Sequence, residues 1–179
     1  MTRSFETQLS YDVYSAMSTA MDAVVSGSPL GLQASGYSKP EFLRISQTVS
    51  AWNSGAPVVA LGTVAALGAI LPEGDKYRYF IDSDFVKVGY MRNFLGVDLM
   101  VLPQVADWTT PFGLKLSDKK IWFVSPSSQK IVKVVLEGNV LAYTSDVYSN
   151  ANLLQTSTLT KSWGTAIATN SVAGLITLA

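Results

Sequence analysis

The spacing of hydrophobic residues changes along the chain, and this change limits the possible folds more than any other feature. Near the N-terminus, apolar residues recur every three or four positions, which is typical of one face of a helix: Phe5, Leu9, Val13, Met17, Ala20, Met21 and Val24. This predicts a helix from about Ser4 to Val25, ended by Gly27 and Ser28-Pro29. After Gly74 the apolar runs are short and strand-like. Helices first and mostly antiparallel strands later indicate an α+β fold rather than a doubly wound parallel sheet.

A second helix is predicted to begin at Ser38-Lys39-Pro40-Glu41. Ser38 is suited to the N-cap, proline fits the first turn, and an acidic residue is favoured near the positive end of the helix dipole. The sequence Asn53-Ser54-Gly55 should end this helix. Its buried stripe is predicted to be Phe42, Ile45, Val49 and Trp52.

The longest apolar run extends from Ala56 to Leu71 and is bounded by Pro57 and Pro72. It is shorter than the roughly 20 residues that a helix needs to span a bilayer, so we expect no membrane segment. The β-branched pair Val58-Val59 favours a strand at residues 57–61, followed by a helix that Thr63 caps. A single helix over the full run is the competing interpretation.

Six later segments have the character of strands. Residues 97–101 and 120–124 are two of them. Residues 130–136 and 140–144 flank Glu137-Gly138-Asn139, which predicts a hairpin with its turn at Gly138. Residues 162–168 and 173–178, on either side of Asn170-Ser171, are predicted as the closing strands.

Composition excludes several chemistries. The chain has no His and no Cys, which rules out thiol nucleophiles, disulfides, Ser-His-Asp triads and zinc fingers. Thirteen basic residues balance 13 acidic ones, which argues against a generic nucleic-acid binder. Only 15% of residues are charged and 48% are hydrophobic. Such a chain either has a large core or has surface that something else covers.

No group of residues has the pattern of an enzyme site, and we expect no catalytic, cofactor or metal site. Asp82-Ser83-Asp84 is a close carboxylate pair, but a capped turn explains it better than acid-base or metal chemistry. Lysines around Trp122-Phe123 fit a solvated strand edge better than a single-strand nucleic-acid surface. The tyrosines offer amphipathic contact surface: Tyr77, Tyr79, Tyr90, Tyr143 and Tyr148.

The order of several motifs resembles the major capsid proteins of tailed bacteriophages with the Hong Kong 97-type fold. The first helix, ending in Met21-Asp22-Ala23-Val24-Val25 and followed by a segment closing in Pro29-Leu30-Gly31-Leu32, resembles that family's spine helix and the stretch after it. The strand and helix of residues 57–71 resemble its buried strand and helix. Phe94 to Val101 resembles a Gly-led strand, and Trp163 to Ile176 resembles its closing strands.

This resemblance implies the core of the Hong Kong 97-like fold, with a peripheral and an axial domain. Residues 1–60 and 150–179 would form the peripheral domain, and residues 61–149 mainly the axial domain. The family's N-terminal arm and extended loop come before the region that the chain matches, so the resemblance begins inside the spine helix.

The resemblance also implies a function. The chain would be a structural, self-assembling subunit of an icosahedral shell around double-stranded DNA, with no enzyme activity and no cofactor. Its partners would be copies of itself in pentamers and hexamers, the portal or scaffolding protein, and loosely held DNA. It would be located in the virion, and in the host cytoplasm during assembly. Contacts between subunits are expected at aromatic residues of two irregular segments: Tyr77, Tyr79, Phe80, Trp108 and Phe112.

Three alternatives remain open on the sequence. The shell of a bacterial nanocompartment has the same fold and encloses enzymes instead of DNA. A small α+β binding module or phage accessory protein would be a monomer. An acid-base enzyme using Asp82 and Asp84 is the third and fits least well.

Overall fold

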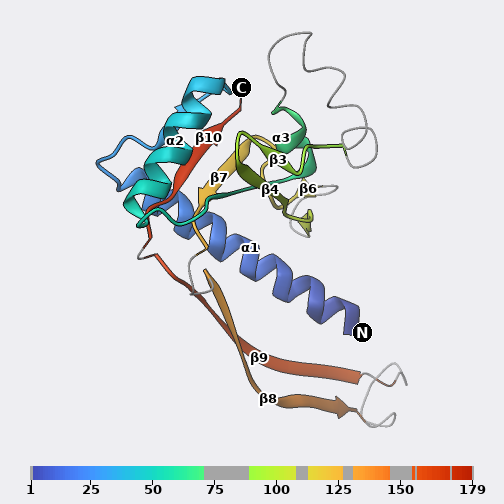
Figure 1. The fold of residues 1–179 in the computed structure, drawn as a ribbon. Helices are drawn as coiled ribbons and strands as arrows, with labels where there is room; N and C mark the ends of the chain where they lie inside the picture. Colours follow the sequence, from blue (N-terminus) through green and yellow to red (C-terminus); the bar gives the residue numbers. More distant parts are fainter. Residues whose placement is uncertain are drawn as a thin grey trace.

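The computed structural model describes residues 2–70, 89–107, 113–126, 131–145, 155, 157–169 and 171–178. The fold is mixed α+β, with a helix-rich N-terminal part and a sheet made mostly later in the chain (Figure 1). The elements in chain order are α1 (Thr2–Ser26), β1 (Gln33–Ser35), α2 (Lys39–Trp52), β2 (Val59–Gly62), α3 (Val64–Gly68), β3 (Asn93–Phe94), β4 (Val97–Val101), β5 (Ala106–Asp107), β6 (Gly113–Leu114), β7 (Lys120–Val124), β8 (Val132–Thr144), β9 (Ser157–Ile167) and β10 (Gly174–Thr177).

Six strands form the main sheet, in the order β1-β10-β7-β2-β4-β3. The pairs β1-β10 and β2-β4 are parallel, and the other three pairs are antiparallel. Two further sheets of two antiparallel strands each are β5-β6 and β8-β9. The expectation of an α+β fold with mostly antiparallel pairing is therefore confirmed.

The main sheet is covered on both faces. Its central strand β7 is buried along most of its length, on both sides of the sheet. Ile121 and Phe123 pack with the buried residues of α2 and α3, whereas Trp122 and Val124 pack with the buried residues of α1. Adjacent strand residues point to opposite faces of a sheet. The arrangement is therefore three layers, with α1 on one face and α2 and α3 on the other.

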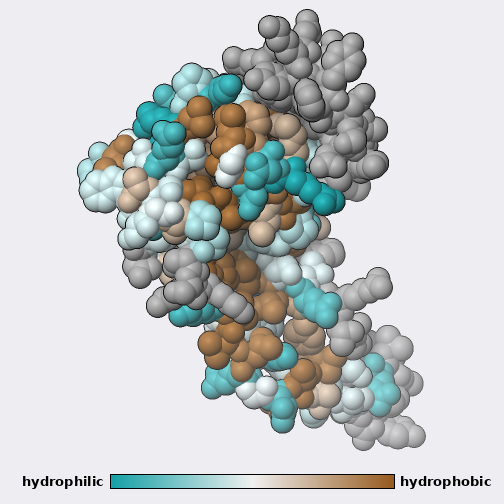
Figure 2. All heavy atoms as spheres, in the orientation of Figure 1, coloured by the Kyte–Doolittle hydropathy of each residue, from teal (hydrophilic) through white to brown (hydrophobic). Residues whose placement is uncertain are grey.

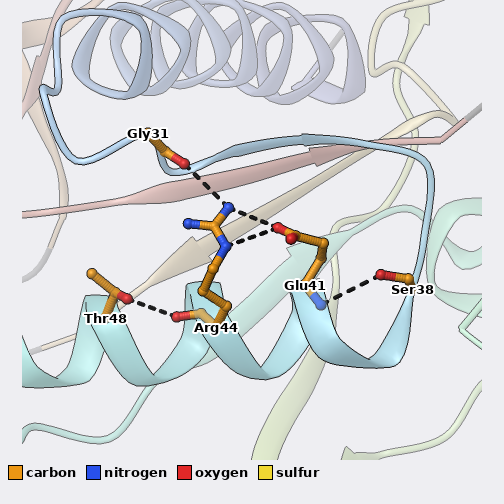
Figure 3. Close-up of polar contacts among 5 residues, drawn as sticks. All are labelled: Gly31, Ser38, Glu41, Arg44 and Thr48. Atoms are coloured by element: carbon orange, nitrogen blue, oxygen red, sulfur yellow. Dashed lines mark hydrogen bonds and ion pairs between the residues drawn. The ribbon is translucent and has the colours of Figure 1, made fainter.

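Helix α2 begins as its sequence predicts (Figure 3). Ser38 is the N-cap, and its hydroxyl accepts a hydrogen bond from the Glu41 backbone N–H at 3.4 Å. Arg44 pairs with the Glu41 carboxylate at 2.7 Å and donates to the Gly31 carbonyl at 3.2 Å. The Arg44 side chain therefore fastens the segment before β1 to the first turns of α2.

The predicted stripe of α2 is wrong at Trp52. Phe42, Ile45 and Val49 are buried, but Trp52 is 62% exposed. The stripe continues at the C-cap Asn53 instead, whose side-chain N–H groups donate to the Val49 and Val172 carbonyls. Asn53, four residues after Val49, lies on the buried face of the helix. Trp52, three residues after Val49, points toward solvent.

The long apolar run divides into a strand and a helix, as predicted. Residues 59–62 form β2, and Thr63 caps α3 by accepting from the Ala66 N–H at 3.2 Å. α3 ends at Gly68, and Ala69 is its C-cap. Among the helices that the structure describes, none is long and apolar enough to cross a membrane.

The predicted hairpin turn at Glu137-Gly138-Asn139 is wrong. Residues 132–144 form one continuous strand, β8, which pairs with β9 over nearly its full length. Gly138 has a φ of +66° and lies at an irregularity in the pairing between Glu137 and Leu141. Glycine accepts positive φ at a β-bulge as readily as in a tight turn, so the local sequence does not distinguish the two.

The two closing strands are confirmed, but they belong to different sheets. β9 pairs with β8, whereas β10 lies between β1 and β7 in the main sheet. The proposed division into residues 1–60 with 150–179 and residues 61–149 stays a prediction. The main sheet contains strands from both ranges.

Candidate interaction surface

Strands β8 and β9 form a two-stranded arm that projects from the layered part of the molecule (Figure 1). We call residues 132–144 and 157–167 the β8-β9 arm. It extends beside the N-terminal half of α1 (Figure 1). The arm and this half of the helix form a second, thinner part of the protein.

Helix α1 is fastened to the arm through Trp163 of β9. The Trp163 indole N–H donates to the Asp12 carboxylate at 3.1 Å. The Phe5 and Trp163 rings meet edge to face, with their centroids 6.3 Å apart. The helix therefore covers β9, where every second residue from Leu159 to Ile167 is half-buried.

The register of the arm shows which side chains face away from α1. Val135 is directly opposite Gly164, and Leu136 is opposite Trp163. Directly opposed residues point to the same face of a sheet, and Trp163 points to the helix. The other face, which we call the open face, carries Lys133, Val135, Glu137, Leu141 and Tyr143 of β8 with Thr158, Thr160, Ser162, Gly164 and Ala166 of β9.

On the open face, β8 carries several large apolar side chains, whereas β9 carries only small side chains. Val135, Leu141 and Tyr143 are 65%, 71% and 69% exposed. Val134, Leu136 and Val140 are also exposed, so six large apolar side chains of this strand face solvent. Figure 2 shows hydrophobic residues gathered in the lower part of the molecule, where the arm projects.

Gly164 leaves open space in the middle of this face. A Cβ atom at Gly164 would meet no atom within 4 Å, and its φ is not in the left-handed region. Neither packing within the chain nor backbone conformation therefore requires glycine here. A flat, exposed surface of small residues beside Val135 is suited to close approach by another protein surface.

The other half of α1 is fixed to the main sheet through Asp22. One carboxylate oxygen of Asp22 accepts from the Lys120 ammonium, and the other accepts from the Trp122 indole N–H at 3.2 Å. The Trp122 side chain is fully buried, and those of Lys120 and Asp22 are about one-third exposed. Aspartates at positions 12 and 22 of one helix thus anchor it to both the arm and the sheet.

Replacing Asp22 with alanine should lower the free energy of unfolding by about 1–2 kcal/mol. The change leaves the Trp122 N–H without its acceptor and removes the partner of Lys120. Urea unfolding followed by circular dichroism measures it. Asp22→Asn is the control: it keeps an acceptor for the indole and should lose less. Equal losses in the two variants would contradict this account.

A shallow hollow lies between α1 and the segment 103–106. It is lined by Glu6, Thr7, Ser10, Tyr14, Pro103, Gln104, Val105 and Ala106. Nearby, Lys115 donates to the Tyr11 hydroxyl at 2.9 Å, and this hydrogen bond raises the pKa of Lys115. Within the described residues, no three His, Cys, Asp or Glu side chains are placed to hold a metal ion.

The predicted contact residues lie outside the part of the chain that the structure describes. Tyr77, Tyr79 and Phe80 fall within residues 71–88, and Trp108 and Phe112 fall within residues 108–112. Asp82 and Asp84 are also in the first of these segments. The predictions made for them therefore stay predictions.

Sequence reasoning missed most of the open face, although it singled out Tyr143 as contact surface. The missed signal is in residues 133–137, where Val134, Val135 and Leu136 follow one another. Consecutive apolar residues in a strand place hydrophobic side chains on both faces. Such a strand needs cover on both sides, but β8 is exposed at every position from Lys133 to Thr144, because α1 covers β9 instead.

Comparisons with known proteins give no match. No family model matches the chain, and no curated protein or solved structure is significantly similar to it.

Proposed function

We propose that this protein is a self-assembling subunit of an icosahedral shell, of the kind formed by tailed-bacteriophage major capsid proteins with the Hong Kong 97-type fold. The observation that carries the proposal is the open face of the β8-β9 arm. Its apolar residues are exposed in the single chain and become buried once another copy covers them.

The physical argument concerns the stability of the arm. An isolated two-stranded hairpin is marginal in water, and the arm has a helix on one face only. Exposed apolar patches on soluble proteins commonly mark interaction sites. Interfaces are rich in aromatic and aliphatic side chains and poor in charge at their centre. Val135, Leu141 and Tyr143 on a strand with few charges agree with that description.

The order of elements also supports the proposal. A long N-terminal helix, a strand followed by a short helix, and closing strands occur in the order that the family resemblance implies. A shell subunit needs no catalytic residue or cofactor, which suits a chain without His or Cys. The proposed partners are other copies in pentamers and hexamers, portal or scaffolding protein, and loosely held DNA within the virion.

Making the open face polar should abolish assembly without unfolding the chain. In the proposed test, the full chain and a Val135→Ser/Leu141→Ser/Tyr143→Ser variant are compared by electron microscopy and sedimentation velocity. The parent protein should form closed particles, because burial of these side chains stabilises the contact. The variant should remain a small folded species, because the substituted side chains are mostly exposed in the single chain.

A matched control replaces three apolar residues that are similarly exposed but lie elsewhere: Trp52→Ser/Met100→Ser/Leu114→Ser. This variant should still assemble. A parent protein that stays monomeric at the highest concentration reached would contradict the proposal and favour a binding module. Particles that contain enzymes and no DNA would instead indicate a nanocompartment.

A further inference from the structure

The outer edge of β8 offers hydrogen-bonding groups that nothing in the described structure uses. β8 pairs with β9 on one side, and no described strand pairs with it on the other. Helix α1 covers β9, while β8 is exposed at every position from Lys133 to Thr144. An edge strand of this kind is a template for pairing with another strand.

The regularly paired part of β8 is bounded by the start of the strand and by a bulge. β8 begins at Val132, and its regular pairing with β9 is interrupted after Glu137, with Gly138 in the left-handed region. A bulge bends a strand and ends regular pairing. The straight segment therefore extends from Val132 to Gly138, and Val135 is at its centre.

Two opposite charges lie at equal distances on either side of Val135. Lys133 is two positions before Val135, and Glu137 is two positions after it. They lie about 13 Å apart on one strand, too far to form an ion pair with each other. In an antiparallel pair of two such strands related by a twofold axis at Val135, each Lys133 would be directly opposite the other copy's Glu137.

We propose that two copies of this protein pair along the β8 edges as antiparallel strands, with the twofold axis at Val135. This inference rests on the self-association proposed above and names the contact that makes it. Moving the axis by one residue along β8 would place Lys133 opposite Val135 or Asn139. The pairing that matches lysine with glutamate is thus also the one that uses the straight segment fully.

The pair has consequences for the open face. The two arms join into a four-stranded sheet, β9-β8-β8-β9, with both α1 helices on the same side. Val135 of the two copies are then directly opposite each other, and apolar residues continue across the axis. Opposite charges and apolar pairs in directly opposed positions both stabilise a strand pair.

The experiment uses the absence of cysteine from the chain. Val135→Cys gives a protein with a single thiol, located on the proposed axis. Directly opposed residues of antiparallel strands have Cα atoms about 4.5–5.5 Å apart, which is within the range of a disulfide. Mild oxidation should therefore convert most of the protein into a covalent dimer, seen on a non-reducing gel and lost on reduction.

Leu141→Cys is the matched control. It is on the same face with similar exposure, but it lies beyond the bulge, six residues from the axis. Two copies of residue 141 would be separated by about 40 Å in the proposed dimer. This variant should give almost no cross-linked dimer at the same protein concentration. Equal cross-linking of the two variants would overturn the proposal, because it would indicate random collision.

Charge exchange tests the register. Lys133→Glu alone should raise the dimer dissociation constant roughly tenfold in sedimentation measurements. The dimer contains two equivalent pairs of residues 133 and 137, and the change places glutamate opposite glutamate in both. Lys133→Glu/Glu137→Lys together should restore it, since each new glutamate is opposite a new lysine. A double variant as weak as the single one would overturn the pairing.

The outcomes separate this inference from the proposed function. Closed particles without Val135→Cys cross-linking would overturn the strand pairing and leave the shell assignment standing. Cross-linked dimers that form no larger particle would support the pairing and contradict the shell assignment.

Discussion

Replacing Phe42 with alanine should lower the free energy of unfolding by about 3–5 kcal/mol, the usual cost of removing a buried aromatic side chain. Phe42 is fully buried between α2 and the main sheet. Its ring meets those of Phe94 and Phe123 edge to face, with centroids 5.2 and 5.0 Å away. Removing it leaves a cavity and breaks both ring contacts. Chemical denaturation followed by tryptophan fluorescence measures the change.

The matched control is on the same helix. Trp52 is larger than Phe42 but is 62% exposed at the last residue of α2. Trp52→Ala should change stability by no more than about 0.5 kcal/mol, since exposed positions without special contacts are tolerant. A loss at Trp52 as large as that at Phe42 would contradict the observed orientation of the end of α2.

Adding one methyl group at Gly174 should destabilise the protein by about 3 kcal/mol, at the upper end of the usual cost of overpacking. A Cβ at this position would lie 2.3 Å from Cγ2 of Ile45, and also near Val49 and Phe123. Ile45 is fully buried, so it has little room to move. The absence of a side chain at Gly174 thus allows α2 to pack closely against strand β10. Thermal unfolding of Gly174→Ala measures the loss.

In contrast to Gly174→Ala, we expect Gly164→Ala on the β8-β9 arm to cause no loss of stability. The same added methyl meets no atom within 4 Å, and alanine loses less conformational entropy than glycine in a strand. The variant should be as stable as the parent or slightly more so. A destabilisation equal to that of Gly174→Ala would mean that Gly164 is packed within the single chain.

Local sequence predicted the helices well because their signals act over a few residues. The caps Ser38 and Thr63 each satisfy a backbone N–H three residues later, and the observed helices begin where these residues predict. The error at Trp52 has a tertiary cause. Asn53 contacts the backbone of Val172, which is far away in sequence, and this contact fixes which side of the helix end faces the sheet.

The strand pairing could not be predicted in the same way. Glycine at position 138 suits a turn and a bulge equally, and only the long partner strand β9 makes it a bulge. Asp12 and Asp22 gave no signal in the sequence, because an aspartate on a helix becomes an anchor only when Trp163 or Trp122 is brought opposite it.

The sequence by itself determined the helices near the N-terminus, the change to strands later in the chain, the caps Ser38 and Thr63 and the absence of thiol and imidazole chemistry, because these depend on residue types and short spacings. Only the tertiary structure decided which apolar residues are covered. It places α1 over β9 and leaves β8 exposed, since burial depends on contacts between segments that are distant in the chain. The change from helical to strand-like spacing therefore predicted strand structure on both sides of Gly138, but not the single continuous strand β8, and the three-dimensional arrangement left its open face uncovered.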